Sequence, residues 1–321
     1  MQYRDEIIAF DASQGISSYP YTNPNFQNVY NIPGTAYSDI LAYLQQKVTE
    51  EAPYLDDPTY VFCCGGYPIR IPSASVLASA NQPDPANSQM AITAASGTTA
   101  QALCNGNPAL GSNDLNVGGR MLRFASSFLT DHPTVSGVYM DTADIRFYLQ
   151  DFSREHFQAA VLPLSYDPTT LKPVIYSGFS SYEYLAQVNR QFRISGRTVM
   201  TNMSLGTSPF LVNYVDVPAS EFHTRQELQW LWDYRRALAC QKPVPLTLQL
   251  VDYVQDVALM HGFMRRCIAY GMFPSFSTGR VVGSNPVEYQ VYWKTPELYE
   301  RDRVYFQRYL PAAKRLHAVG W

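Results

Sequence analysis

The sequence predicts an α/β protein, a TIM-like (β/α)8 barrel in which the whole chain, residues 1–321, forms a single domain. From about residue 116 onward, stretches with helical periodicity alternate with short apolar stretches, which is typical of parallel βα arrays. An open doubly wound sheet is the rival fold, but no glycine pattern that binds nucleotides follows an expected strand, so its nucleotide-binding version has little support. The chain also exceeds the roughly 250 residues that such a barrel typically needs.

The N-terminal third of the chain has the least regular pattern. We expect strands over residues 6–10 and 60–64, with a helix near 36–50 between them. Residues 65–115 are rich in Gly, Pro, Ser, Asn and Ala, which predicts a long irregular insertion, with a partly helical excursion or further elements without a clear pattern as alternatives. The whole chain then provides only about seven strands, so the barrel is incomplete at its N-terminus unless a further strand lies within residues 11–35.

Beyond residue 115 the expected helices and strands follow one another at short intervals. Ser180 and Thr224 each precede a glutamate by three residues, the capping-box pattern that opens a helix. Gly196 suits the left-handed end of the first of these helices, and Pro311 should kink or divide the last helix. The expected elements are a helix over 116–130, a strand over 136–141, a helix from 180, strands over 197–202 and 210–216, a helix from 224, a strand over 243–250, a helix over 252–270, a strand over 272–276 and a helix from 295–296.

Composition limits the partners of the protein. The formal net charge is −3, which gives no strong field for nucleic acid or for an anionic membrane. No apolar run approaches the roughly 20 residues that a membrane-spanning helix needs. The N-terminus lacks a signal-peptide pattern, so we expect a cytoplasmic protein, or an extracellular or periplasmic one if the chain is a fragment. The oligomeric state is left open.

The first candidate for chemistry is Asp141, which follows the apolar residues of the strand expected over 136–141. In a (β/α)8 barrel, the C-terminal ends of the strands carry the catalytic groups. Asp144 lies three residues further on and could share the site. The alternative is that Asp141 only caps the turn after the strand.

A second acidic place follows the strand expected over 210–216. It contains Asp216 and Glu221, which would face the same end of the barrel as Asp141. Glu221 could instead stabilise the N-terminus of the next helix by its charge. Asn202 ends another expected strand, where its amide could bind a sugar hydroxyl or a neighbouring backbone group.

Three polar residues lie side by side at Arg154, Glu155 and His156. In an extended loop, Arg154 and His156 would share one side and Glu155 the other. They are candidates for substrate binding, and the alternative is a cluster of ion pairs at the surface.

Two carboxylates at a barrel mouth suit hydrolysis of a glycosidic bond, in which one protonates the leaving oxygen and the other acts as nucleophile or base. We therefore predict Asp141 and Glu221 as the catalytic pair, with Asp144 and Asp216 as alternatives. The expected substrate is an oligo- or polysaccharide. No metal site or cofactor is expected, because the histidines show no metal-binding spacing, and a serine-hydrolase elbow is absent.

The segments that contain Asp141, Asn202 and Glu221, with three others, also resemble a known family, the large bacterial proteins described as glycoside-hydrolase-like. The resemblance spans roughly residues 105–321 and implies a TIM-type barrel between β-sandwich modules, with carbohydrate as substrate. Where we would expect glycine before the second acid, this chain has Ala219 and Ser220. A non-catalytic carbohydrate-binding, structural or assembly protein on the same scaffold is the alternative. The resemblance is carried by residues 137–141, 152–157, 179–185, 199–202, 216–221 and 234–239.

Overall fold

The computed structural model divides the chain into two units. The first comprises Met1–Val199 and Asn213–Val215, and the second comprises Met200–Val212 and Asp216–Trp321. That the chain is a single domain stays a prediction. The structure describes residues 2–24, 26–29, 48–49, 71–72, 100–103, 106–109, 117–143, 150–151, 154–168, 170–203, 209–222, 228–239, 242–248, 256–276, 278–280, 289–291 and 295–320.

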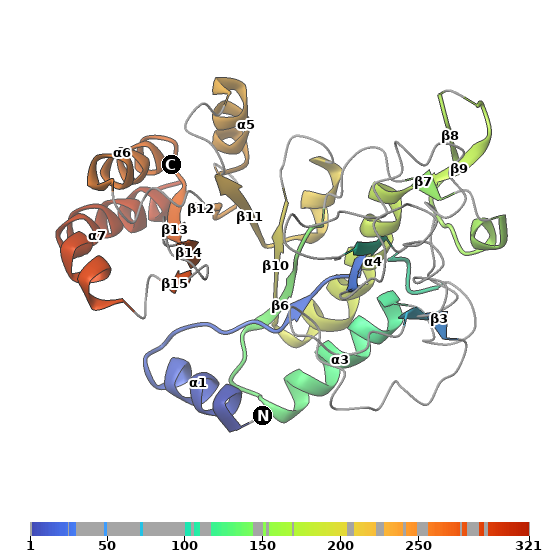
Figure 1. Cartoon of the computed structure of the whole chain (residues 1–321), viewed down its shortest axis with the longest axis horizontal. Helices are drawn as coiled ribbons and strands as arrows, with labels where there is room; N and C mark the ends of the chain where they lie inside the picture. Colours follow the sequence, from blue (N-terminus) through green and yellow to red (C-terminus); the bar gives the residue numbers. More distant parts are fainter. Residues whose placement is uncertain are drawn as a thin grey trace. The chain divides into compact units, whose positions relative to one another are not determined.

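A six-stranded, mostly parallel sheet confirms the α/β class (Figure 1). Parallel pairing joins β1 to β6, β10 to β11, β11 to β12 and β12 to β13. The strands are neighbours in the order in which they occur in the chain, without the reversal that marks a doubly wound sheet. Their bounds are β1 (Tyr21–Thr22), β6 (Gly137–Met140), β10 (Thr198–Asn202), β11 (Val217–Phe222), β12 (Pro245–Leu248) and β13 (Phe273–Phe276).

In the first unit, helices pack their apolar faces around the start of the sheet. Helix α4 contacts β6 and buries Tyr184, Leu185 and Val188, while β6 buries Val138 and Met140. The other described elements of this unit are α1 (Gln2–Ser13), β2 (Phe26–Val29), β3 (Val48–Thr49), β4 (Ile71–Pro72), β5 (Ala100–Leu103), α3 (Val117–Asp131), β7 (Gln150–Asp151), η4 (Arg154–Gln158), β8 (Ser165–Tyr166), β9 (Pro173–Tyr176), α4 (Ser177–Phe192) and η5 (Arg193–Ser195).

The second unit has an aromatic core. The Phe222 ring lies 5.6 Å from that of Trp232 and 5.5 Å from that of Phe263, which in turn lies 6.0 Å from Phe276. Such tilted and edge-on pairs add to the stability that burial alone provides. The unit also contains α5 (Gln229–Ala239), α6 (Val257–Ala269), β14 (Thr278–Arg280), β15 (Tyr289–Val291) and α7 (Pro296–Ala318), and η6 (Pro209–Tyr214) crosses the boundary between the units.

Several predicted elements are confirmed. The helix at 116–130 is α3, the strand at 136–141 is β6, and the strands at 197–202, 243–250 and 272–276 are β10, β12 and β13. The strand suspected within residues 11–35 exists as β1, which pairs with β6. Gly196 has a φ of 75° after the short helix η5, and α7 begins at Pro296, as expected.

Other predictions are wrong, each for a local reason. Residues 6–10 lie inside helix α1, since Ile8 is buried but Ile7 and Phe10 are exposed, which is not the alternation of a strand. Residues 209–214 form the 3-10 helix η6, so the strand comes later, at β11. Helix α4 begins at Ser177, and Ser180 is therefore not its N-cap.

The remaining differences concern the last helix and the N-terminal third. Pro311 is exposed and does not divide α7, which runs from Pro296 to Ala318. The end of the helix predicted near 36–50 is strand β3, and strands β4 and β5 fall within the predicted insertion at 65–115. The strand predicted over 60–64 and the cap at Thr224 lie outside the described residues.

A close backbone approach starts β6. A methyl group on Gly137 would overlap the backbone of Thr198, so only glycine fits there.

We expect Gly137→Ala to lower the free energy of unfolding by at least about 1–3 kcal/mol, because the strands must move apart. Gly262→Ala is the matched control, since its added methyl meets no atom within 4 Å, and it should stabilise α6 by about 0.5–1 kcal/mol. Urea unfolding of both variants measures this, and a Gly137→Ala protein as stable as the parent would contradict the packing.

The hairpin between β8 and β9 holds an exposed leucine in a strained conformation. Leu171 has a φ of 58° and an exposed fraction of 73%. The turn is closed by the Leu171 N–H, which donates to the Asp167 carbonyl at 2.8 Å, and by the Thr170 N–H, which donates to the Asp167 carboxylate at 2.7 Å. Leucine pays a steric cost in this region that asparagine largely avoids.

We therefore expect Leu171→Asn to raise the free energy of unfolding by up to about 1 kcal/mol, because the strain is relieved while little apolar contact is lost. Ile194→Asn is the control: Ile194 is 86% exposed and has an ordinary φ, so its replacement should change stability by less than about 0.5 kcal/mol. Thermal and urea unfolding of the two variants provide the comparison. Equal effects of both changes would show that the strain at Leu171 contributes nothing.

Candidate functional site

Asp141 lies directly after β6, at the carboxyl end of the strand. Its carboxylate accepts a hydrogen bond of 2.5 Å from the Tyr21 hydroxyl, and its N–H donates to the Thr22 carbonyl at 2.8 Å. The next residue, Thr142, has a φ of 54°, and its hydroxyl accepts a hydrogen bond of 3.3 Å from the Asn23 amide. Residues from the ends of β1 and β6 therefore fix the orientation of a partly exposed carboxylate.

A neutral polar layer lies beneath this carboxylate. The Thr22 hydroxyl donates to the Tyr139 carbonyl at 2.8 Å. Tyr184 is fully buried in the first unit, and this burial raises the pKa of its hydroxyl. Tyr184 therefore stays protonated at physiological pH and adds no charge to the interior of this unit.

Glu221 occupies a second polar cluster, which belongs to the second unit. It lies within β11, opposite Thr247, and not after a strand as the sequence suggested. Its carboxylate accepts a hydrogen bond of 2.9 Å from the Asn202 amide, so the structure brings together two of the predicted residues. From α5 the buried Arg235 donates to the Glu221 carbonyl and to the Ser220 hydroxyl, both at 3.1 Å. The backbone at Glu221 is thus fixed while its side chain remains partly exposed.

The polar segment at residues 154–156 is the 3-10 helix η4 and not an extended loop, so the predicted alternation of sides is wrong. Arg154 is exposed. His156 is buried, and its Nδ1 lies 2.6 Å from the carboxylate of the equally buried Asp151, which sequence reasoning missed. The side chain of Glu155 lies outside the described part of the structure.

Two further predicted acids, Asp144 and Asp216, were alternatives for the catalytic pair. Asp144 lies outside the described residues. Asp216 precedes β11, so it lies at the amino end of this strand, whereas the prediction placed it at the carboxyl end of a strand. The position at a strand's carboxyl end, which made Asp216 an alternative to Glu221, is therefore not observed. The role of Asp144 in the site stays a prediction.

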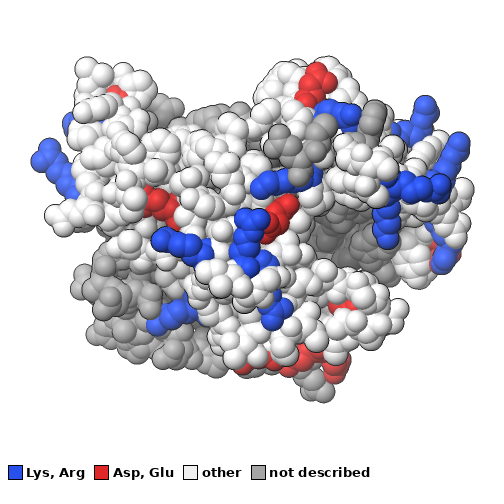
Figure 2. Space-filling model, turned by 180° about the vertical axis from the view of Figure 1, so that it is seen from behind, with Lys and Arg blue, Asp and Glu red and all other residues white. Residues whose placement is uncertain are grey.

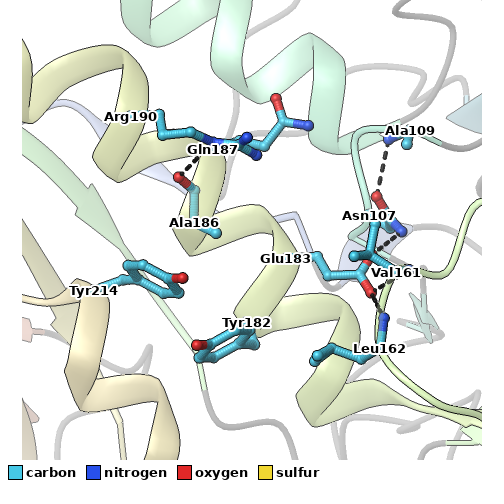
Figure 3. Close-up of a pocket in the computed structure, with 10 residues that line it drawn as sticks. All are labelled: Asn107, Ala109, Val161, Leu162, Tyr182, Glu183, Ala186, Gln187, Arg190 and Tyr214. Carbon is cyan, nitrogen blue, oxygen red and sulfur yellow. Dashed lines mark hydrogen bonds between the residues drawn. The ribbon is translucent and has the colours of Figure 1, made fainter.

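The first unit also contains a cavity of about 280 Å³ beside α4 (Figure 3). Sequence reasoning missed it, since its walls come from segments far apart in the chain. The carboxylate of Glu183 forms part of one wall and accepts hydrogen bonds of 2.8 Å from the N–H groups of Val161 and Leu162 and another from the Asn107 amide. The cavity is lined by Asn107, Ala109, Val161, Leu162, Tyr182, Glu183, Ala186, Gln187, Arg190 and Tyr214.

Burial raises the pKa of the Glu183 carboxyl, while the N–H groups of Leu162 and Val161 act in the opposite direction. With a pKa higher in the folded than in the unfolded chain, the folded state binds more protons between the two pKa values. The stability of the protein therefore falls as the pH rises through this window above 4.5.

Glu183→Gln should remove this dependence, because the amide does not titrate. We expect the free energy of unfolding of the parent protein, relative to that of Glu183→Gln, to decline as the pH rises from about 4 to about 7. Urea unfolding across this range measures the difference, with Glu297→Gln as the control for loss of an exposed negative charge. A difference that stays constant with pH would contradict the raised pKa.

Metal ligands, membrane-spanning helices and surface charge are further features that can indicate function. Among the described residues, no three His, Cys, Asp or Glu side chains are grouped as metal ligands would be. In the same part of the chain, no helix has the length and apolar character needed to cross a membrane. Figure 2 shows Lys and Arg as well as Asp and Glu on one face, with uncharged surface between most of them.

No protein-family model matches the chain, and no curated protein or solved structure was found to match it. The fold and the clusters define it as an α/β protein with a mostly parallel sheet. One partly exposed acid follows a strand of this sheet, and another lies near the end of a second strand.

Proposed function

We propose that this protein is a carbohydrate-active hydrolase that cleaves glycosidic bonds with a pair of carboxylates, Asp141 and Glu221. The main support is that each is partly exposed, lies at or near the carboxyl end of a parallel strand and accepts a hydrogen bond from a neutral group. A carboxylate that is oriented by such a hydrogen bond and stays accessible suits proton transfer and nucleophilic attack.

The strand order supports a TIM-like barrel as the scaffold. Six strands follow one another in chain order, as they do in a (β/α)8 barrel, whereas a doubly wound sheet reverses direction at its switch point. In the proposed barrel, catalytic residues come from the carboxyl ends of different strands. This arrangement requires the two carboxylates to face each other within about 10 Å, the outer limit for glycosidases.

The other polar residues are proposed as substrate contacts. Asn202 holds Glu221 in place through its amide nitrogen, and its amide group is also suited to binding a sugar hydroxyl. Arg154 is exposed and can bind a hydroxyl or carboxylate. His156 is buried and paired with Asp151, and the sequence alone proposes it and Glu155 as substrate contacts.

A second candidate function is non-catalytic carbohydrate binding. The cavity beside α4 favours it, because Tyr182 and Tyr214 contribute aromatic surface to its lining and Gln187 contributes an amide. This combination suits a ligand with apolar faces and hydroxyl edges.

Hydrolysis of a polysaccharide panel by the parent and by Asp141→Asn and Glu221→Gln proteins tests the first proposal. We expect each variant to lose at least about 100-fold in rate, because each removes an acid, base or nucleophile. Asp131→Asn is the matched control, since Asp131 is exposed at the end of α3. Full activity of both variants would refute the assignment, and a parent that binds polysaccharides but hydrolyses none would favour the second candidate.

A further inference from the structure

We infer that the cavity beside α4 is a separate carbohydrate site, which binds a single sugar ring that bears a carboxylate, as in a uronic acid. This inference rests on the proposed function and deepens it, because it names acidic polysaccharides as the substrate class. The cavity lies entirely within the first unit, where α4, the end of η6 and residues 107–109 and 161–162 form its walls.

The size of the cavity limits the ligand to about one ring. Its volume of about 280 Å³ is just below the roughly 300–1,000 Å³ found for small-molecule sites. Two of the lining residues, Val161 and Arg190, are exposed, so a longer chain could continue into solvent from a single bound unit.

Arg190 provides the positive charge. It is the cation among the residues that line the cavity, and its guanidinium is exposed. Among the described residues its hydrogen bond is a long one of 3.4 Å, from Nε to the Ala186 carbonyl of its own helix. The planar guanidinium therefore has donors to offer to a ligand, and it binds a carboxylate best because two parallel hydrogen bonds can form.

The acid in the wall does not oppose this binding. Glu183 directs its carboxylate toward Asn107 and Leu162, away from the two tyrosine rings (Figure 3). Its oxygens accept hydrogen bonds from the Asn107 amide and from two backbone N–H groups. Burial also raises the pKa of this carboxyl, which reduces its tendency to be charged.

Two tyrosines and a glutamine complete the recognition surface. The rings of Tyr182 and Tyr214 lie 4.7 Å apart at 57°, and their hydroxyls converge in Figure 3. The hydrogen bond to Tyr182 raises the pKa of Tyr214, and the charge of Arg190 acts in the opposite direction. A sugar ring can contact the aromatic surface while its hydroxyls bind the tyrosine hydroxyls and the Gln187 amide.

The test is an NMR titration of the full chain with ¹³C-labelled tyrosine, using sodium glucuronate, glucose and sodium acetate as probes. We expect glucuronate to shift the Tyr182 and Tyr214 signals and to bind at least about tenfold more tightly than either other probe. Equal binding of acetate would mean a simple anion site, and equal binding of glucose would mean that the carboxylate is not recognised. Either result overturns the inference.

Variants assign the effect to Arg190. Arg190→Gln should weaken glucuronate binding at least about tenfold, and Arg190→Lys should restore only part of it, because lysine keeps the charge but not the paired hydrogen bonds. Arg265→Gln, at an exposed arginine of α6, is the matched control and should bind as the parent does. If Arg190→Gln does not fold, Tyr214→Phe provides the second variant, and an unchanged affinity in it or in a folded Arg190→Gln protein overturns the inference.

The same titration separates this inference from the proposed function. Glucuronate binding should persist in an Asp141→Asn, Glu221→Gln double variant, because neither residue lines the cavity. Binding by a parent protein that hydrolyses no polysaccharide would remove the proposed activity and leave the site. Hydrolysis without glucuronate binding would remove the site and leave the activity.

Discussion

The close approach of Gly137 to the backbone of Thr198 is the constraint on which the first unit depends most directly. The Thr198 N–H also donates to the Ser136 carbonyl at 3.0 Å, so the start of β6 is held against the start of β10. Parallel pairing then carries β6 forward with its side chains in a fixed register, and Asp141 follows as the first residue beyond the strand. Gly137, a residue without a side chain four positions before Asp141, therefore determines where the Asp141 carboxylate lies.

Environment separates the acids that can carry chemistry from those that hold the fold together. Glu183 accepts hydrogen bonds at both oxygens and joins a loop to α4, and Asp151 is buried against His156. Asp141 and Glu221 are different, because each keeps part of its surface exposed and accepts a hydrogen bond from an uncharged side chain. Carboxylates thus stabilise the fold at Glu183 and Asp151. Those of Asp141 and Glu221 are the candidates for catalysis.

Sequence patterns predicted those helices and strands that depend mainly on interactions between residues close together in the chain. The apolar stretch before Asp141 identified β6, and its acid was placed correctly at the strand end. Ser180 and Glu183 showed the right spacing for a cap, yet Glu183 binds backbone N–H groups about 20 residues away, which spacing cannot reveal. The apolar residues 210–216 fitted a strand and a helix equally well, so Glu221 was expected beyond a strand and lies inside one. The cavity beside α4 depends on contacts between distant segments, and no local pattern indicates them.

The hydrogen bond between Tyr21 and Asp141 joins residues 120 positions apart, and β1 has no place in the sheet until β6 exists. A ribosome that adds about 5–20 residues per second needs roughly 6 to 24 seconds to cover that interval. Strand β1 is therefore synthesised well before β6 and must wait for this partner before the two can pair. The order in which this part of the protein is made is not the order in which it assembles.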